Sequence, residues 1–226
     1  MKSLIRTQSS ILMAFEGVNP LNWNALVDDL KGFKYKDFGE GTALSNVGEQ
    51  TPLLMAQKDE NQWIYLPRQK HLILRGTDPD KSVAHFKQVR DKVQRQFNKR
   101  KWEKNFRFYE IHVVHEFEPR DTTPMDMMRG IAPAKGAEPF IGAFRDKKPV
   151  MYAFRFANWE GQLPSNLRES VPWFEITVQP MFENTDRMVS EIVSRDKDLD
   201  EVESMAARMR VAVFAFMDEH DKGDQH

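Results

Sequence analysis

Two histidines and three glutamates lie close together between residues 110 and 118, and both residue types bind metal ions. If this segment is a strand, Glu110, His112 and Glu116 share one face, because side chains alternate between faces. His115 then points to the opposite face, so the two histidines cannot share one metal ion without distortion. The sequence leaves two interpretations, a metal site of His112, Glu110 and Glu116, or a sheet with one polar face and one buried histidine. The second is favoured, and no metal or other cofactor is expected.

The basic segment from Lys87 to Arg107 is a second cluster of candidate functional residues. It holds nine basic and two acidic side chains, a net charge of +7 in a chain whose formal net charge is -1. Lys92, Arg95 and Lys99 have the spacing of one helix face, where they would neutralise phosphates. Cations near a helix end also complement its dipole, and this interpretation is the favoured one. The residues expected to bind, if a partner binds here, are Arg68, Lys70, Arg90, Lys92, Arg95, Lys99, Arg100, Lys101 and Lys104.

An acidic run from 196 to 203 precedes the last expected helix. Carboxylates at a helix N-terminus interact favourably with the helix dipole, which is a sufficient reason for the run. The run could also pair with a basic surface, in the same chain or in a partner. Three methionines at 125, 127 and 128 are expected to fill gaps in the core.

The composition excludes several classes of function. The chain has no cysteine, so thiol nucleophiles, disulfides and cysteine-ligated metal sites are impossible. The near-zero net charge argues against a histone-like polycation, and 11% aromatic residues argue against a disordered acidic protein. Phosphate-binding glycine loops and the serine-hydrolase elbow are absent from the sequence. No apolar run reaches membrane-spanning length, so a cytoplasmic protein without a membrane partner is expected.

Helix starts are the clearest structural signals in the chain. Asn19-Pro20, Asp78-Pro79 and Thr123-Pro124 each join a capping side chain to a proline, which suits the first helical position. Gly32 is a plausible end for the first of these helices, and Asp198 predicts a further helix reaching about Met217. Strands are expected over the segments 11–17, 62–66, 71–75, 106–117, 140–144, 150–156 and 173–182.

This order of elements predicts an α+β fold, with antiparallel or mixed sheets covered by helices. Strands followed by a long helix occur twice, so the chain possibly contains two similar halves. The turn-rich stretch from Pro119 to Pro139 places the expected boundary between residues 1–120 and 121–226, unless both form one continuous domain.

The element order also resembles a known family. The matching parts are a strand with an Asn-Pro-capped helix, the hairpin Trp63 to Leu74, the strand Tyr109 to Val114 and the helix around Arg208 to Phe214. This arrangement is similar to a sporadically distributed bacterial family of small proteins of unknown function, sometimes found near defence or toxin loci. The arginine-rich strand signature of that family is not matched at 109–115. The resemblance implies an accessory or binding role and carries over no catalytic residue.

Three hypotheses of function follow. The leading one is a non-enzymatic cytoplasmic binding or accessory protein that acts on a macromolecular partner, a protein or a nucleic acid, in bacterial defence or regulation. The second is a nucleic-acid-binding protein that uses the basic segment 87–107. The third is a metal-dependent hydrolase that uses His112 with Glu110 or Glu116. A homo-oligomer is compatible with each of them.

Overall fold

A computed structural model describes residues 3–17, 21–44, 50–96, 99–129, 153–158 and 170–220. Its strands are β1 (Ser3–Phe15), β2 (Lys36–Leu44), β3 (Gln50–Lys58), β4 (Asn61–Leu66), β5 (His71–Gly76), β6 (Phe106–Glu118), β7 (Phe154–Ala157), β8 (Trp173–Pro180) and β9 (Met188–Asp196). Its helices are α1 (Trp23–Gly32), α2 (Pro79–Gln96), α3 (Lys99–Asn105), α4 (Pro124–Arg129) and α6 (Leu199–His220).

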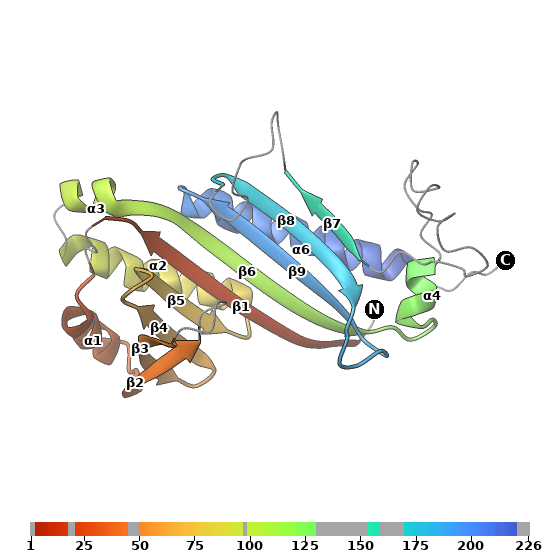
Figure 1. Ribbon diagram of the computed structural model, residues 1–226, viewed down its shortest axis with the longest axis horizontal. Helices are drawn as coiled ribbons and strands as arrows, with labels where there is room; N and C mark the ends of the chain where they lie inside the picture. Colours follow the sequence, from red (N-terminus) through yellow and green to blue (C-terminus); the bar gives the residue numbers. More distant parts are fainter. Residues whose placement is uncertain are drawn as a thin grey trace.

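The described strands form one antiparallel sheet of nine strands, in the order β2-β3-β4-β5-β1-β6-β9-β8-β7 (Figure 1). Strands β1 and β6 are the longest and pair at the centre of the sheet, with Ile11 opposite Ile111. Strand β6 also pairs with β9, so the sheet continues across the expected boundary at residue 120. The α+β fold expected from the sequence is therefore confirmed.

The two long helices α2 and α6 lie against the same face of the sheet (Figure 1). Their buried side chains pack with the strand residues of that face into one core, which includes Trp63, Phe86 and Ile111. The burial of these apolar side chains on one face is the main source of stability for such a layered fold. We call the opposite face, which carries Gln62, Arg75, Ser10 and His112, the polar face.

The two parts of the sheet repeat one arrangement around the β1–β6 pair. Beside β1 lies β5, which is followed by α2, and beside β6 lies β9, which is followed by α6. The helices also share a burial pattern, because five of the six buried positions of α2 recur as buried positions in α6 120 residues later, Val83 being the exception. These positions are Pro79, Ser82, Phe86, Val89 and Val93 in α2, and Leu199, Val202, Ala206, Met209 and Val213 in α6.

Most of the expected helix starts are found, and one is corrected. The side chains of Asp78, Thr123 and Asp198 each accept a hydrogen bond from a backbone N–H in the first turn of the following helix. Helix α1, however, begins at Trp23 rather than after Asn19-Pro20, and Asn22 is its N-cap residue. It ends at Gly32 as expected. Asn19 and Pro20 themselves lie outside the described part of the chain.

The strand predictions were incomplete. The segments expected at 62–66, 71–75 and 106–117 correspond to β4, β5 and β6, and the strand expected at 11–17 begins earlier, at Ser3. Strands β2, β3 and β9 were not predicted. The hairpin expected over 140–156 lies mostly outside the described residues, except for β7. Among the described helices, none combines the length and apolarity needed to cross a bilayer.

Candidate functional site

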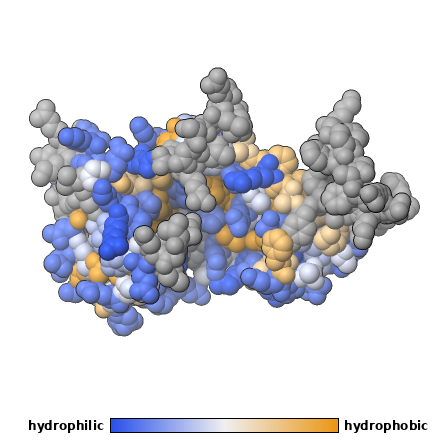
Figure 2. Space-filling view, in the orientation of Figure 1, coloured by the Kyte–Doolittle hydropathy of each residue, from blue (hydrophilic) through white to orange (hydrophobic). Residues whose placement is uncertain are grey.

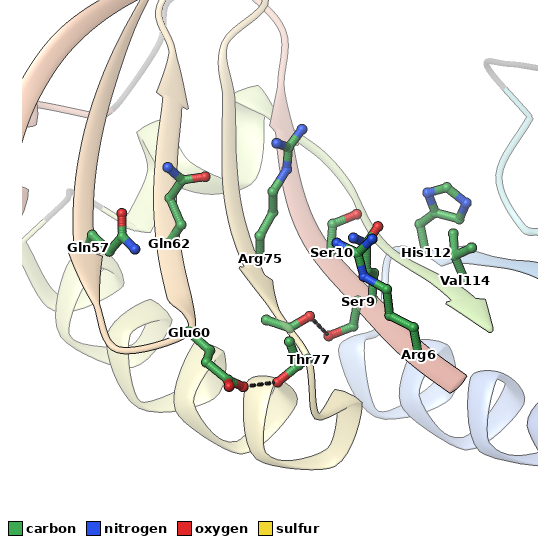
Figure 3. Close-up of a pocket in the computed structure, with 12 residues that line it drawn as sticks. Arg6, Ser9, Ser10, Gln57, Glu60, Gln62, Arg75, Thr77, His112 and Val114 are labelled. Atoms are coloured by element: carbon green, nitrogen blue, oxygen red, sulfur yellow. Dashed lines mark hydrogen bonds between the residues drawn. The ribbon is translucent and has the colours of Figure 1, made fainter. Parts of the chain in front are cut away.

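A row of polar side chains crosses five strands on the polar face. Gln57 of β3 is paired with Gln62 of β4, Gln62 with Arg75 of β5, Arg75 with Ser10 of β1, and Ser10 with His112 of β6. Residues paired in this way project from the same face of a sheet, as the close-up shows (Figure 3). We call these five residues the polar row.

The row arises from simple alternation along each strand. In β5, Leu72 and Leu74 are buried in the core, so Arg75 must point to the polar face. In β6, Ile111 and Val113 are buried, and His112 between them is directed outward. These strands therefore bury an apolar set on the helix side. Arg75 and His112 project from the other side, where Ile73 and Val114 are their neighbours along the strands.

The polar row lines a depression of about 530 Å³. Arg6, Gln8, Glu60 and Thr77 are also part of its wall. Figure 3 shows the side chains of Arg6, Glu60 and Thr77 around the same hollow. Two guanidinium groups and three glutamine amides line the wall, against a single carboxylate. Among the described residues, no phenylalanine, tyrosine or tryptophan lines it. This wall is rich in hydrogen-bond donors and suits a ligand that carries oxygen acceptors.

The charged groups of the depression differ in how far they are already engaged. The carboxylate of Glu60 accepts a hydrogen bond from the hydroxyl of Thr77. Arg6 lies 3.8 Å from a carboxylate oxygen of Glu116, with 58% of its side chain exposed. Arg75 is exposed, and among the described residues it has no ion-pair partner. Arg75 is therefore the cation of this wall that is most available to a ligand.

The three residues expected as metal ligands do not come together as a set. Glu110 is bound by the guanidinium of Arg195, whose Nε lies 2.7 Å from a carboxylate oxygen. Glu116 lies between Arg6 and Arg187, at 3.8 and 3.5 Å. The described residues contain no group of three acidic or histidine side chains placed to hold a metal ion. Because arginines occupy both carboxylates, a metal ion would have to displace an ion pair at each.

The predicted opposite orientation of the two histidines is confirmed. His112 lies on the polar face, with its Nε2 3.9 Å from a carboxylate oxygen of Glu191. His115 is buried on the helix side, where its Nδ1 is 2.9 Å from the Thr7 hydroxyl. Burial, reinforced by the positive charge of Arg210, lowers the pKa of His115 to about 4. His115 is the buried histidine that the sequence analysis favoured.

A second polar cluster lies farther along the polar face and was not foreseen. Arg195, 8% exposed, donates to Glu110 and lies over the Phe108 ring at 4.8 Å. Next to it, Glu175 accepts hydrogen bonds from the indole N–H of Trp173 and from Arg155. These groups satisfy one another, so the cluster ties β6, β7, β8 and β9 together rather than leaving charge free for a ligand.

Much of the basic segment is engaged within the molecule. Lys87 binds Asp200 at 2.7 Å and Glu203 at 2.5 Å, both on α6. The acidic run thus pairs with a basic surface of its own chain, one of the alternatives left open by the sequence. Arg90 pairs with Asp91 at 2.7 Å, and Lys92 lies 4.4 Å above the Phe33 ring.

The remaining candidate cations are scattered over several elements. Arg95 and Lys104 are exposed, and Arg68 is exposed in the turn between β4 and β5, where Lys70 donates to the Gly17 carbonyl. The single helix face expected for Lys92, Arg95 and Lys99 is wrong, because α2 ends at Gln96 and Lys99 begins α3. The side chains of Lys99, Arg100 and Lys101 lie outside the described part of the structure.

The sequence reasoning missed most of the polar row. It placed His112 on one face of its strand but did not group it with Gln57, Gln62, Arg75 or Ser10, because these residues are adjacent only through the pairing of five strands. Alternation within 71–75 was the one available signal, since it directs Arg75 away from the leucines. Comparison of the chain with models of known protein families finds no match, and comparison with curated proteins finds none either.

Proposed function

We propose that this chain is a non-enzymatic binding protein that holds a macromolecular partner on its polar face. The observation that carries the proposal is the polar row, five cross-strand neighbours that line one depression. The proposed setting is the cytoplasm of a bacterium, in defence or regulation, as the family resemblance implies.

The chemistry of the depression supports binding rather than catalysis. Its wall offers amides, guanidinium groups and a hydroxyl, all of which recognise oxygen acceptors. Its one carboxylate, Glu60, is hydrogen-bonded to Thr77, and the nearby Glu116 lies between two arginines. A metal-dependent hydrolase with His112 is less well supported, because both of its candidate carboxylates pair with arginine.

Nucleic-acid binding through segment 87–107 has weaker support than binding on the polar face. Lys87, Arg90 and Lys92 already contact acidic or aromatic side chains of the same molecule. A polyanion would compete with these contacts before gaining affinity. The exposed Arg95 and Lys104 are the cations through which this alternative would act.

Affinity purification with three baits tests the proposal. The baits are the wild type, the polar-face variant Gln62→Glu/Arg75→Glu, and the control Arg208→Glu, which changes an exposed arginine on α6. Bound proteins and nucleic acids are quantified by mass spectrometry and sequencing. We expect a partner that the wild type and the control retain and the polar-face variant loses. If every retained molecule is equally abundant with all three folded baits, the proposal is wrong.

A further inference from the structure

The polar row presents donors at regular intervals. Neighbouring strands of a sheet are roughly 4.8 Å apart, so the four steps from Gln57 to His112 span roughly 19 Å. That length fits an extended segment of about six residues, which would lie across the strands. The row therefore has the dimensions of a binding site for a chain rather than for a single small ion.

The charge of the depression selects a ligand with negatively charged oxygen. Arg75 stands in the middle of the row, between Gln62 and Ser10, and its guanidinium is exposed (Figure 3). Arg6 adds a second guanidinium to the wall, and the only carboxylate there is bonded to Thr77. A guanidinium group binds carboxylate or phosphate through two parallel hydrogen bonds, which makes Arg75 the natural anchor.

The surroundings favour a carboxylate on a peptide over a nucleic-acid backbone. Among the described residues, the wall has no phenylalanine, tyrosine or tryptophan on which a base could stack, and its one aromatic ring is the imidazole of His112. The polar face also carries Glu116 and Glu191, and its Arg155, Arg187 and Arg195 each pair with a glutamate. A polyphosphate chain, with a charge on every unit, would be repelled by these carboxylates, whereas a peptide segment needs only one or two acidic side chains for Arg75 and Arg6. Glutamine amides, in contrast, both donate to and accept from peptide groups.

We propose that the depression binds an extended acidic segment of a protein partner, with one carboxylate on Arg75 and the peptide groups on Gln57 and Gln62. This inference rests on the proposed function and specifies its ligand. Arg6, four residues before Ser10 on the same strand β1, receives a second acidic side chain. Figure 2 shows hydrophobic side chains gathered on the half of this view that holds β7 and β8, whereas the half that holds β2 to β5 is largely hydrophilic. The apolar pocket lined by Phe154, Ile176 and Phe216 lies on the helix side of the sheet, against α6, and is not part of the site.

Nuclear magnetic resonance titration tests the ligand class directly. The isotope-labelled full chain is titrated with a decaglutamate peptide, a decaserine peptide and a single-stranded oligonucleotide of ten thymidines. We expect decaglutamate to shift the Arg75 Nε–H signal and the backbone signals of Ser10 and Gln62, and decaserine to leave them in place. The affinity should fall only modestly with added salt, because two ion contacts are made. Absence of shifts at these residues with decaglutamate would overturn the inference.

Two variants locate the contact. Arg75→Gln keeps a polar side chain in the row and should weaken decaglutamate binding about tenfold or more, as expected for loss of a charged hydrogen bond. Arg208→Gln, on α6, should leave the affinity unchanged. If the oligonucleotide shifts the same signals at lower concentration than decaglutamate does, the ligand is a phosphate chain and the inference is wrong. The proposed function survives that result, and it fails only in the affinity purification.

Discussion

Among single residues, the buried His115 has the clearest effect on the stability of the fold. His115 is 1% exposed, and its pKa is lowered from 6.5 to about 4 by burial and by Arg210. The unfolded chain takes up a proton near pH 6.5, whereas the folded chain resists it until about pH 4. Protonation therefore favours unfolding, so this contribution to stability is present above pH 6.5 and is lost as the pH falls toward 4.

We expect the free energy of unfolding to fall by on the order of 3 kcal/mol over that pH range on account of His115. The pKa values of His71 and His85 are lowered by burial as well, so they act in the same direction. Urea unfolding of the wild type and of His115→Leu, measured from pH 7.5 to 4.5, checks this. The variant should show a distinctly smaller loss, and equal slopes for the two proteins would contradict the prediction.

Gly76 illustrates a close approach between strand and helix. A β-carbon at this position would clash with the Ser82 hydroxyl of α2 and lie 2.8 Å from the Asn61 side-chain oxygen. We expect Gly76→Ala to lower the free energy of unfolding by about 1–3 kcal/mol, the usual cost of overpacking. Gly39→Ala is the matched control, because nothing lies within 4 Å of its added carbon. Comparable losses in thermal or urea unfolding would show that Gly76 is not constrained.

Single residues of the site were only partly predictable from the sequence. His112 and His115 could be assigned to opposite faces because one strand, with its strict alternation, determines both. Gln57, Gln62, Arg75 and Ser10 could not be grouped, since their proximity depends on the register of four strand pairs. Arg195 lies 85 residues after its partner Glu110, and Arg187 lies 71 residues after its partner Glu116. The composition of the chain does not indicate either pair.

At the scale of elements, the capping signals were the most reliable. Asp78 accepts hydrogen bonds from the N–H groups of Asp80 and Lys81, and these bonds lower the pKa of its carboxyl. We expect Asp78→Ala to lower the free energy of unfolding by about 1 kcal/mol and Asp78→Ser to restore most of it. The difference between wild type and Asp78→Ala should shrink as the pH drops below 3.8, because the carboxylate is then lost. A pH-independent difference in chemical unfolding would count against the cap.

The strands were harder to predict, and the missed ones show why. In β9, Ser190 and Ser194 are buried while Val189 and Val193 face the polar side, so alternation of hydrophobicity is scrambled. In β2, two glycines and several charged residues conceal the strand, and β3 contains Pro52. Strands β4, β5 and β6 were recognised because their helix-side positions are mostly apolar, although Ile64, Ile73 and Val114 project from the polar face. A strand was thus predictable where its hydrophobic residues are mostly the ones that are buried.

At the scale of the whole molecule, the continuous sheet predicts a single cooperative unit. The core contains residues from both expected halves, and β6 pairs with β1 on one side and β9 on the other. We expect one thermal transition, with the same midpoint by far-ultraviolet and near-ultraviolet circular dichroism. Two separated transitions would instead support independent domains at 1–120 and 121–226. A single transition would leave no role for that boundary in stability.

The pairing of β1 with β6 has a further meaning. Two equivalent strands that meet antiparallel, each flanked by its own strand and long helix, have the geometry of a two-fold symmetric dimer interface. Fusion of two copies of a half-length ancestor would produce this arrangement. Divergence of the copies would then account for the asymmetry of the polar face, where one half supplies the exposed Arg75 and the other supplies arginines locked to glutamates. On that history, the proposed binding surface belongs mainly to the first copy, and β6 of the second copy adds His112 to it.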